Sequence, residues 1–339
     1  MEEYKKLVYT DFSDPVITSP DEILVKVKAV SICGSDVHGF DGSTGRRQPP
    51  IIMGHEAAGE VVALGSGVKK FKAGDRVTFD STIYCGSCFF CRTGQVNLCD
   101  ARVVLGVSCD DYRRHGAFAE YVVVPEHISH PLPPGLSYEE GAMIEPAAVA
   151  AHAFRISPVK LNENAAVVGA GLIGLLLIDI LKSSISGQVC ALDIEESRRE
   201  AARKRGADYV FDPSEADLDK KILDITGGRG LDRVFEAVGA TKPIGTAISI
   251  VRKGGSVTLI GNISPKVEIP LQSLVSREIS LFGSCAIAGE YPIVLDLMAR
   301  KKINVESLIS KKAPLCEGQL WFEKLYKREE NLLKIVLIP

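Results

Sequence analysis

The chain of 339 residues is too long for one ordinary hydrophobic core, so its length predicts about two domains. Hydrophobic residues make up 46% and charged residues 24%, which are globular values and exclude a disordered chain. The formal net charge of −3 excludes the basic footprint that nucleic acid or an anionic membrane requires. It does not exclude small anionic substrates, because a local arginine pair can bind one.

The first residues, MEEYKKLVYTDF, show no apolar core followed by a small-residue cleavage site, so no signal peptide is expected. The longest apolar run, 165–178, is shorter than the ~20 residues that cross a bilayer, and Asp179 closes it. Four of the nine cysteines crowd into 85–99. Clustered thiols without an export signal indicate a metal site in a reducing compartment, which predicts a cytoplasmic protein.

Short strands dominate the first part of the chain. Residues 22–32 (EILVKVKAVSI) alternate apolar and polar side chains, the period of a half-buried strand. Residues 51–67 read as a strand, a His-Glu pair and a second strand, and shorter strands are expected at 74–77 and 119–125. The intervening 39–50 has loop composition. Strands this short and numerous predict an antiparallel, barrel-like first domain.

Metal-ligand side chains flank that loop. C-G-S-D-V-H begins at Cys33, and G-H-E ends with His55 and Glu56. Thiolate, imidazole and carboxylate are the groups that zinc prefers, so we predict a catalytic zinc site of Cys33, His55 and a carboxylate, with Glu56 close by. The alternative from these residues alone is a buried cysteine and a hydrogen-bonded core histidine that never meet.

A second cysteine motif interrupts the strands. The spacing C-x2-C-x2-C-x7-C places four thiols among polar and glycine residues. Four thiolates make a closed tetrahedral zinc site without a position for water, which indicates a structural metal; the alternatives are free thiols or disulfides. The predicted ligands are Cys85, Cys88, Cys91 and Cys99.

After Pro146 the pattern changes to strands alternating with helices. A buried strand runs directly into G-x-G-x-x-G and a helix, the fingerprint of a dinucleotide site in which the glycines permit a tight turn, approach of the pyrophosphate and helix packing. The next strand ends in an acid that suits the ribose hydroxyls and repels a 2′-phosphate, so NAD is favoured over NADP. The predicted coenzyme residues are Gly169, Gly171, Leu172, Ile173, Gly174, Asp193 and Arg198.

Arg198 and its neighbour Arg199 are positioned to weaken the preference for NAD, the alternative being solvated helix charges. Further buried strands are expected at 207–212, 231–239, 254–262 and 278–284. Apolar strands separated by helices predict a parallel, doubly wound α/β sheet. The last part of the chain is too short for a third domain and is expected to return to the first one.

Taken together, these motifs resemble the zinc-containing medium-chain alcohol/polyol dehydrogenases over essentially the whole chain. The resemblance includes CGSDVH, GHEAAGEV, the four-cysteine lobe, GAFAEYVVVP, IEPAAVAAHA and GAGLIG. It implies a GroES-like β-barrel catalytic domain, interrupted by a Rossmann coenzyme domain. The expected boundaries are 1–147 with 285–339 for the zinc domain, which includes the structural-zinc lobe 85–99, and 148–284 for the NAD domain.

The resemblance also implies residue roles. Glu145 in I-E-P completes the catalytic zinc ligands with Cys33 and His55, as in sorbitol, threonine and butanediol dehydrogenases. Glu56 is then the acid beside the metal, and Asp36 holds the free nitrogen of His55. For the reaction, zinc lowers the pKa of the substrate alcohol and NAD accepts the hydride.

A proton relay follows from the same motif. Ser35 is expected to contact the substrate hydroxyl and His38 to pass its proton to solvent. The partner is therefore a small-molecule alcohol, with no nucleic acid or membrane, and the family forms homodimers and homotetramers.

The subfamily stays open. Gly39, Ala286 and Ile287 stand where sorbitol dehydrogenases have polar or aromatic substrate contacts, and the tryptophan segment of threonine dehydrogenases is absent. Galactitol-1-phosphate dehydrogenases match comparably well, and the pair Arg46–Arg47 could bind a substrate phosphate, against the alternative of a solvent-facing loop pair.

Three classes of function are therefore weighed: a zinc- and NAD-dependent secondary-alcohol or polyol dehydrogenase, a zinc-free reductase of the same superfamily, and a zinc-ribbon nucleic-acid binder. The presence of the catalytic ligand residues argues against the second class. The acidic balance argues against the third.

Overall fold

The computed structural model describes residues 1–185 and 187–339 and divides into two compact units. The first unit comprises Met1–Pro146 and Ile287–Pro339, and the second comprises Ala147–Ala286. Each unit has its own buried apolar cluster, as expected for a chain of this length. Among the described residues, every helix falls short of the length and apolarity that crossing a membrane would require.

The first unit is built on a seven-stranded sheet that is antiparallel except where its last two strands pair. Alternating side chains of the first strand are buried, including Ile23, Val25 and Val27 at 0%, 0% and 2% exposure. The main path runs β16-β17-β1-β2-β3-β9, and β8 also pairs with β1. The strands are β1 (Glu22–Ser31), β2 (Glu56–Leu64), β3 (Arg76–Phe79), β8 (Tyr121–Pro125), β9 (Ser129–Pro131), β16 (Lys311–Pro314) and β17 (Ile335–Ile338).

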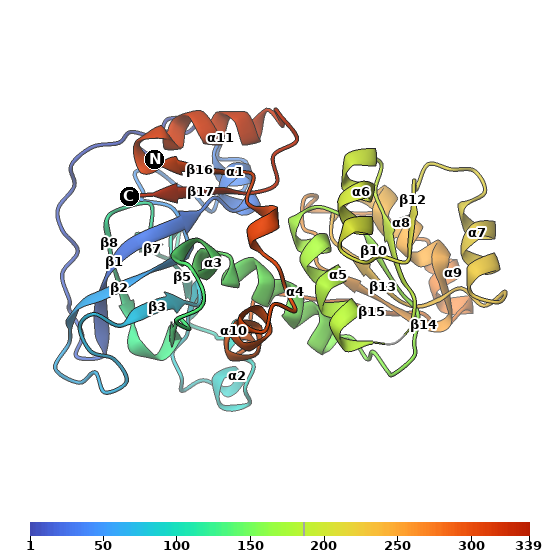
Figure 1. Cartoon of the computed structure of the whole chain (residues 1–339), viewed down its shortest axis with the longest axis horizontal. Coiled ribbons are helices and arrows are strands. Elements are labelled where there is room, and N and C mark those ends of the chain that lie inside the picture. The colour runs from blue at the N-terminus through green and yellow to red at the C-terminus, as the bar shows by residue number, and fades with distance from the viewer. Residues whose placement is uncertain (186) are drawn as a thin grey trace. The chain divides into compact units, whose positions relative to one another are not determined.

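The end of the chain returns to this sheet. Strand β17 pairs with β1 in the register Val30 with Leu337 and Ser31 with Val336. Figure 1 shows β16 and β17, in red, beside the blue and green strands of the first unit. Helix α10 (Tyr291–Ala299) and helix α11 (Gly318–Tyr326) belong to the same segment.

One expected strand is absent from this unit. Residues 51–55 belong to no strand, and β2 begins only at Glu56. The physical reason is that the backbone here bonds to segments outside a ladder. Gly116 N–H donates to Ile52 O, and Phe118 N–H donates to Met53 O. The expectation of a strand before the His-Glu pair was therefore wrong.

The second unit contains a six-stranded parallel sheet in the order β12-β11-β10-β13-β14-β15. The central strands are buried along their length because helices cover them, as the continuous apolar runs predicted. The doubly wound parallel sheet is confirmed. Its strands are β10 (Ala165–Val168), β11 (Val189–Leu192), β12 (Tyr209–Phe211), β13 (Leu231–Glu236), β14 (Val251–Leu259) and β15 (Ser280–Gly283).

Helices of this unit pack on the sheet with apolar faces. Helix α5 (Leu172–Ser184) buries residues 174–181, and α8 (Thr241–Ile250) contributes Ile244 and Ile248 to the same core as β10 and β13. Figure 1 shows α5 and α6 (Glu196–Lys204) in the foreground of this unit. Further helices of this unit are α7 (Leu218–Ile225), α9 (Leu271–Ser276) and most of α4 (Ile144–Ile156).

Candidate metal centre and coenzyme site

The predicted ligands near the start of the chain sit at element ends. Strand β1 ends at Ser31, and Cys33 then caps the short helix α1 (Gly34–Gly39). His55 directly precedes β2. The element ends bring the sulfur of Cys33 into one group with His55 and Glu56, in which the ligand atoms all lie within 4.8 Å of one another. The alternative in which cysteine and histidine never meet is therefore excluded.

The imidazole of His55 is buried and faces an acid. Its Nδ1 lies 3.4 Å from Asp36 Oδ2 and has no closer hydrogen-bond partner. Burial lowers the pKa of His55, but Asp36 and Cys33 outweigh burial and raise it well above its usual value. Burial raises the pKa of Asp36, but His55 and Arg47 outweigh burial and lower it. The surroundings therefore favour positive charge at this ring, from a proton or from a metal ion on its other nitrogen.

Glu56 has partners that the sequence did not reveal. Its Oε2 lies 2.6 Å from Lys334 Nζ, and the Ser31 hydroxyl is bonded to the same oxygen. Both side chains of the ion pair are 1% exposed. Lys334 also donates to Ile32 O at 3.0 Å. In the sequence, the only sign of this ion pair was the lysine directly before the apolar run IVLI. The alternation of a strand did not explain a charged residue there.

Glu145 lies in the first turn of α4 (Ile144–Ile156) and is outside the 4.8 Å group. Its Oε1 accepts a hydrogen bond from Ser81 Oγ at 3.0 Å. Burial raises the pKa of Glu145 to about 7, against the opposing charge of His55, and Glu56 raises it further. Burial likewise raises the pKa of Asp80 to about 7, and Asp80 was not singled out in the sequence.

Zinc fits this donor set. Buried carboxylates with raised pKa values beside a thiol and an imidazole are costly as anions unless a cation joins them. A bound dication reverses this balance and holds thiol and carboxyl groups deprotonated. The buried Nδ1 of His55 against Asp36 is the arrangement that orients a metal-binding imidazole through its other nitrogen.

The predicted relay residues lie on α1. Ser35 Oγ is 3.2 Å from Cys33 Sγ, to which it donates. His38 is exposed, and its carbonyl accepts from Ser43 Oγ at 3.2 Å. Both residues are exposed, so solvent can reach them.

The burial of Arg47 contradicts both interpretations of the Arg46–Arg47 pair, the phosphate-binding pair and the solvent-facing loop pair. The residue is 4% exposed, and its guanidinium is bonded to Asp36, so it faces neither solvent nor a substrate phosphate. Its neighbour Arg46 is exposed. The two arginines therefore do not form a bidentate phosphate clamp, because the chain buries one of them against the acid of α1.

The four cysteines of the lobe gather as one group. Their sulfurs lie within 4.8 Å of one another, and Cys85 Sγ and Cys91 Sγ are 4.0 Å apart. A tetrahedral zinc–thiolate site has sulfur separations of about 3.8 Å, whereas a disulfide brings sulfurs to about 2.05 Å. All four are free thiols, which excludes disulfides in this structure, and the geometry fits a metal. Hydrogen bonds from Ser87 lower the pKa of Cys85 to about 6.

The glycine loop of the second unit has the geometry of a dinucleotide site. Gly169 has a φ of +95°, which a residue with a side chain rarely adopts. A Cβ at Gly174 would overlap the carbonyl oxygen of Gly169, so the helix packs closely on the turn. Gly171 is the N-cap of α5, where an added Cβ would meet Arg198 NH1 at 3.9 Å, and Leu172 and Ile173 form the first turn. A pyrophosphate can approach free N–H groups there.

Asp193 follows β11 and is tied to this loop. Its Oδ2 accepts from Ala170 N–H at 2.8 Å, and its Oδ1 accepts from Glu195 N–H at 3.0 Å. Each carboxylate oxygen keeps a lone pair for a ribose hydroxyl. Arg199 is held by Asp212 and by the carbonyl of Asp193, whereas Arg198 reaches Asp193 only at 3.9 Å and remains 36% exposed. Arg198 also pairs with Glu195 at 3.5 Å, and it is the more exposed of the two arginines.

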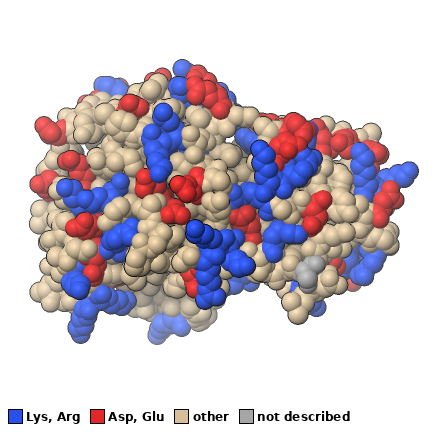
Figure 2. Space-filling model, viewed as in Figure 1, with Lys and Arg blue, Asp and Glu red and all other residues tan. Residues whose placement is uncertain are grey.

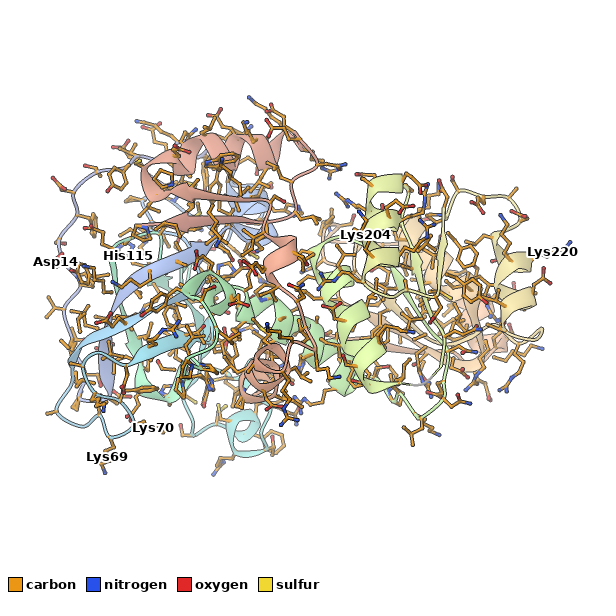
Figure 3. The ribbon with its side chains drawn as sticks, viewed as in Figure 1. Asp14, Lys69, Lys70, His115, Lys204 and Lys220 are labelled. Carbon is orange, nitrogen blue, oxygen red and sulfur yellow. The ribbon has the colours of Figure 1, made fainter. Side chains whose placement is uncertain are left out.

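The other histidines have structural surroundings. His115, which is labelled in Figure 3, accepts from Ile52 N–H at 3.2 Å and packs against Phe12. His130 stacks on Tyr291. None of these belongs to a metal-ligand group among the described residues. Figure 2 shows lysine and arginine interspersed with aspartate and glutamate on the face drawn, a pattern unlike the basic stripe of a nucleic-acid binder.

Comparison with known proteins agrees with this geometry. Residues 19–134 match the family model of the alcohol dehydrogenase GroES-like domain, and residues 173–300 match that of the zinc-binding dehydrogenases. The chain is 36% identical to the D-arabitol-phosphate dehydrogenase of Enterococcus avium, over 98% of this chain and 94% of the relative. This chain belongs to the zinc-containing medium-chain alcohol dehydrogenase family.

Two further members of this dehydrogenase family are similar over nearly the full length. The sorbitol dehydrogenase of Bacillus subtilis is 34% identical over 94% of this chain and 90% of its own. A zinc-binding dehydrogenase of Sinorhizobium meliloti, solved with NADP bound, superimposes with a TM-score of 0.90 at 31% identity, covering 100% of this chain and 97% of that one.

Membership of this family confirms the predictions of the fold, the enzyme class and the type of cofactor. The fold is a GroES-like domain with a Rossmann domain, and the chain is a zinc-dependent alcohol oxidoreductase that uses a nicotinamide cofactor. The zinc-ribbon nucleic-acid binder is excluded, because the cysteine lobe lies within the residues matched by the dehydrogenase model.

Proposed function

We propose that this dehydrogenase oxidises a secondary hydroxyl of a polyol or polyol phosphate to a ketone, with NAD as the hydride acceptor. The observation that carries the proposal is the gathering of the Cys33 thiol, the His55 imidazole and the Glu56 carboxylate at the end of β1 and the start of β2. An oxidoreductase of this family requires such a donor set to hold zinc at an open position.

We assign Cys33, His55 and Glu145 as the ligands of the catalytic zinc. Charge supports this assignment, because Lys334 already neutralises Glu56, whereas a thiolate and the Glu145 carboxylate together balance a dication. Glu56 then remains the adjacent acid, beside the metal position but with its charge neutralised by Lys334. The four lobe cysteines hold a second, structural zinc.

Zinc bound at this site supplies the Lewis acidity that lets a substrate hydroxyl lose its proton near neutral pH. In the proposed relay, Ser35 takes that proton at its hydroxyl oxygen and releases its own hydroxyl proton, which His38, exposed on the same short helix, carries on to solvent. A nicotinamide coenzyme bound at the glycine loop would supply the two-electron acceptor for the hydride of the substrate carbon.

NAD is the preferred coenzyme in this proposal. The Asp193 carboxylate lies at the end of β11 and is held by Ala170 N–H, so a 2′-phosphate would meet a fixed negative charge. Arg198 lies close enough to offset part of that charge. A relative of known structure was solved with NADP bound, so this fold accepts a 2′-phosphate in that protein, and we propose that the acid selects NAD in this chain.

The substrate class is proposed from the relatives and from one exposed side chain. Similar dehydrogenases are named for D-arabitol phosphate and for sorbitol, which are both polyols. Arg46 is exposed at the end of the loop that follows α1, and we propose that this single guanidinium contacts a substrate phosphate. A butanediol- or threonine-type activity is the alternative that the substrate panel tests.

We also propose that the chain forms a homodimer or homotetramer through the edge of its parallel sheet. Edge strand β15 exposes Ser280 and Gly283, and Leu271 and Val275 of α9 are 63% and 66% exposed. Exposed apolar side chains beside an unpaired edge favour association. Light scattering of the purified protein tests this, and a monomer at micromolar concentration would reject it.

The experiment follows NADH formation across matched pairs of polyols and their phosphates, together with 2,3-butanediol and threonine. We expect a polyol or polyol phosphate to give the highest kcat/KM, two zinc ions per chain, and loss of one zinc with the activity in Cys33→Ser. Undiminished activity in Cys33→Ser would overturn the proposal. Arg46→Ala is expected to raise KM for phosphorylated substrates only, and an equal rise for neutral polyols would reject the phosphate contact.

A further inference from the structure

We propose that Arg47 is a positioning residue of the metal centre and that Gly39 provides the space for it. The inference rests on the proposed function and deepens it. Arg47 Nε donates to Asp36 Oδ1 at 2.9 Å, and its NH2 nitrogen lies 2.8 Å from the same oxygen. Asp36 is 0% exposed, so the guanidinium is the cation that this buried carboxylate faces from the loop side.

The two oxygens of Asp36 have separate partners. Oδ1 accepts from Arg47, which leaves Oδ2 directed at His55 Nδ1, 3.4 Å away. A carboxylate bonded at one oxygen cannot rotate freely about its last bond. Arg47 therefore orients the acid that in turn orients the imidazole, and the imidazole is a proposed zinc ligand.

The same guanidinium reaches the proton relay. Arg47 NH2 donates to Ser35 Oγ at 3.3 Å, and Ser35 Oγ donates to Cys33 Sγ at 3.2 Å. One side chain thus contacts two groups, each of which touches a different proposed zinc ligand. A planar guanidinium can do this because its nitrogens point in fixed directions, whereas the ammonium of a lysine is a single compact charge.

The backbone around Arg47 is fixed from another segment. Ser108 Oγ donates to Gln48 O at 2.6 Å, and Gln48 N–H donates to Ser108 O at 3.3 Å. Arg47 itself forms an isolated bridge with Ser108. Arg47 NH1 closes onto Arg46 O at 2.9 Å. The guanidinium is therefore placed by a defined backbone and not by a mobile loop tip.

The absence of a side chain at Gly39 leaves the space that the Arg47 side chain occupies. A Cβ at residue 39 would overlap Cγ of Arg47, near the root of the side chain where bending away is costly. Gly39 is the last residue of α1 and its φ is not positive, so an alanine fits the backbone, and its severest overlap is with Arg47, with a lesser crowding of Thr44 Oγ1 at 3.3 Å. Residues 39 and 47 are consequently coupled, because a side chain at residue 39 would displace the side chain of Arg47.

A purely structural ion pair is the competing explanation. It predicts that loss of Arg47 lowers stability and leaves the metal centre of the folded protein unchanged. Positioning predicts instead that the metal is held less tightly, because altered support of a metal-bound histidine typically costs 10–100-fold in affinity or activity. The two explanations differ in zinc retention.

The test compares zinc transfer from the holoenzyme to a colorimetric chelator in the wild type, Arg47→Gln, Arg47→Lys and Gly39→Ala. Arg114→Gln is the matched control, since Arg114 pairs with Glu22 in the same unit at 3.4 Å, away from the proposed ligands. The structural zinc of the cysteine lobe is the internal reference in every protein.

We expect Arg47→Gln to release the catalytic zinc about 10–100-fold faster, with the lobe zinc unchanged. Arg47→Lys restores zinc retention through Asp36 but not kcat, because an ammonium cannot also hold Ser35. Gly39→Ala reproduces the Arg47→Gln release rate, and the double variant is no worse than either single one.

The proposal is overturned if Arg47→Gln releases zinc at the wild-type rate while its melting temperature falls as in Arg114→Gln. It is also overturned if Gly39→Ala and Arg47→Gln are additive. The zinc readout is independent of substrate, so an enzyme that oxidises no polyol would refute the proposed function and still decide the role of Arg47.

Discussion

Lys334 Nζ lies 2.6 Å from Glu56 Oε2, and the two residues are 278 positions apart in the chain. Both side chains are 1% exposed, and burial alone would lower the pKa of Lys334. Glu56 and Cys33 outweigh burial and raise it, so the lysine stays charged. This pair joins the last strand to the residue beside the proposed zinc and determines whether Glu56 is available to a metal.

Removal of Lys334 should lower the free energy of unfolding substantially. Lys334→Met leaves a buried carboxylate without its cation, which typically costs about 3–5 kcal/mol of unfolding free energy. Urea denaturation of the zinc-loaded protein measures the loss. The double variant Lys334→Met/Glu56→Gln should recover a large part of it, because no buried charge then lacks a partner. Additive losses in the double variant would show that the pair is not coupled.

The two acids near the metal should respond differently to neutralisation. Glu145→Gln is expected to lose about one zinc ion per chain, because Glu145 is the proposed third ligand. Glu56→Gln is expected to retain both, because Oε2 of Glu56 is already bonded to Lys334 and Ser31. Metal analysis by mass spectrometry checks this. Loss of zinc from Glu56→Gln alone would assign Glu56 as the ligand.

Coenzyme choice should follow the charge at the end of β11. Asp193→Asn removes the carboxylate that a 2′-phosphate would meet, so the ratio of kcat/KM for NADP to that for NAD should rise at least about tenfold, equivalent to about 1.4 kcal/mol. Arg198→Ala should lower the same ratio. Initial rates with each coenzyme measure it, and an unchanged ratio in Asp193→Asn would locate the discrimination elsewhere.

Stability should depend on pH through His130. Burial lowers the pKa of this imidazole to about 4, with a further contribution from Lys70. An unfolded histidine titrates near 6.5, so between about pH 6.5 and 4 the unfolded chain binds a proton that the folded protein refuses. The stabilising contribution is complete above pH 6.5 and is lost as the pH falls toward 4.

The variant His130→Asn isolates the contribution of this imidazole to the pH dependence of stability. His130→Asn should lose less stability over this range than the wild type, by up to about 1.4 kcal/mol per pH unit. Acid release of zinc affects both proteins equally and cancels in the difference. Parallel curves for the two proteins would contradict the assignment of a lowered pKa to His130.

Much of the fold followed from local patterns. The apolar strands after Pro146 predicted the parallel sheet, because a strand covered on both faces cannot alternate. The strand expected before the His-Glu pair is absent. An apolar segment has the same sequence pattern whether its backbone bonds to a strand ladder or to separate groups such as Gly116 N–H. Periodicity reports burial and not hydrogen-bond partners.

The sequence by itself determined the chemistry of the donor groups, the closed spacing of the cysteine lobe and the glycine turn, because those depend on residue type and on short distances along the chain. Only the tertiary structure decided that Arg47 faces Asp36 instead of a phosphate and that Lys334 neutralises Glu56. The physical reason is that a buried charge is stabilised by whichever opposite charge the fold brings beside it, and that partner can lie anywhere in the sequence.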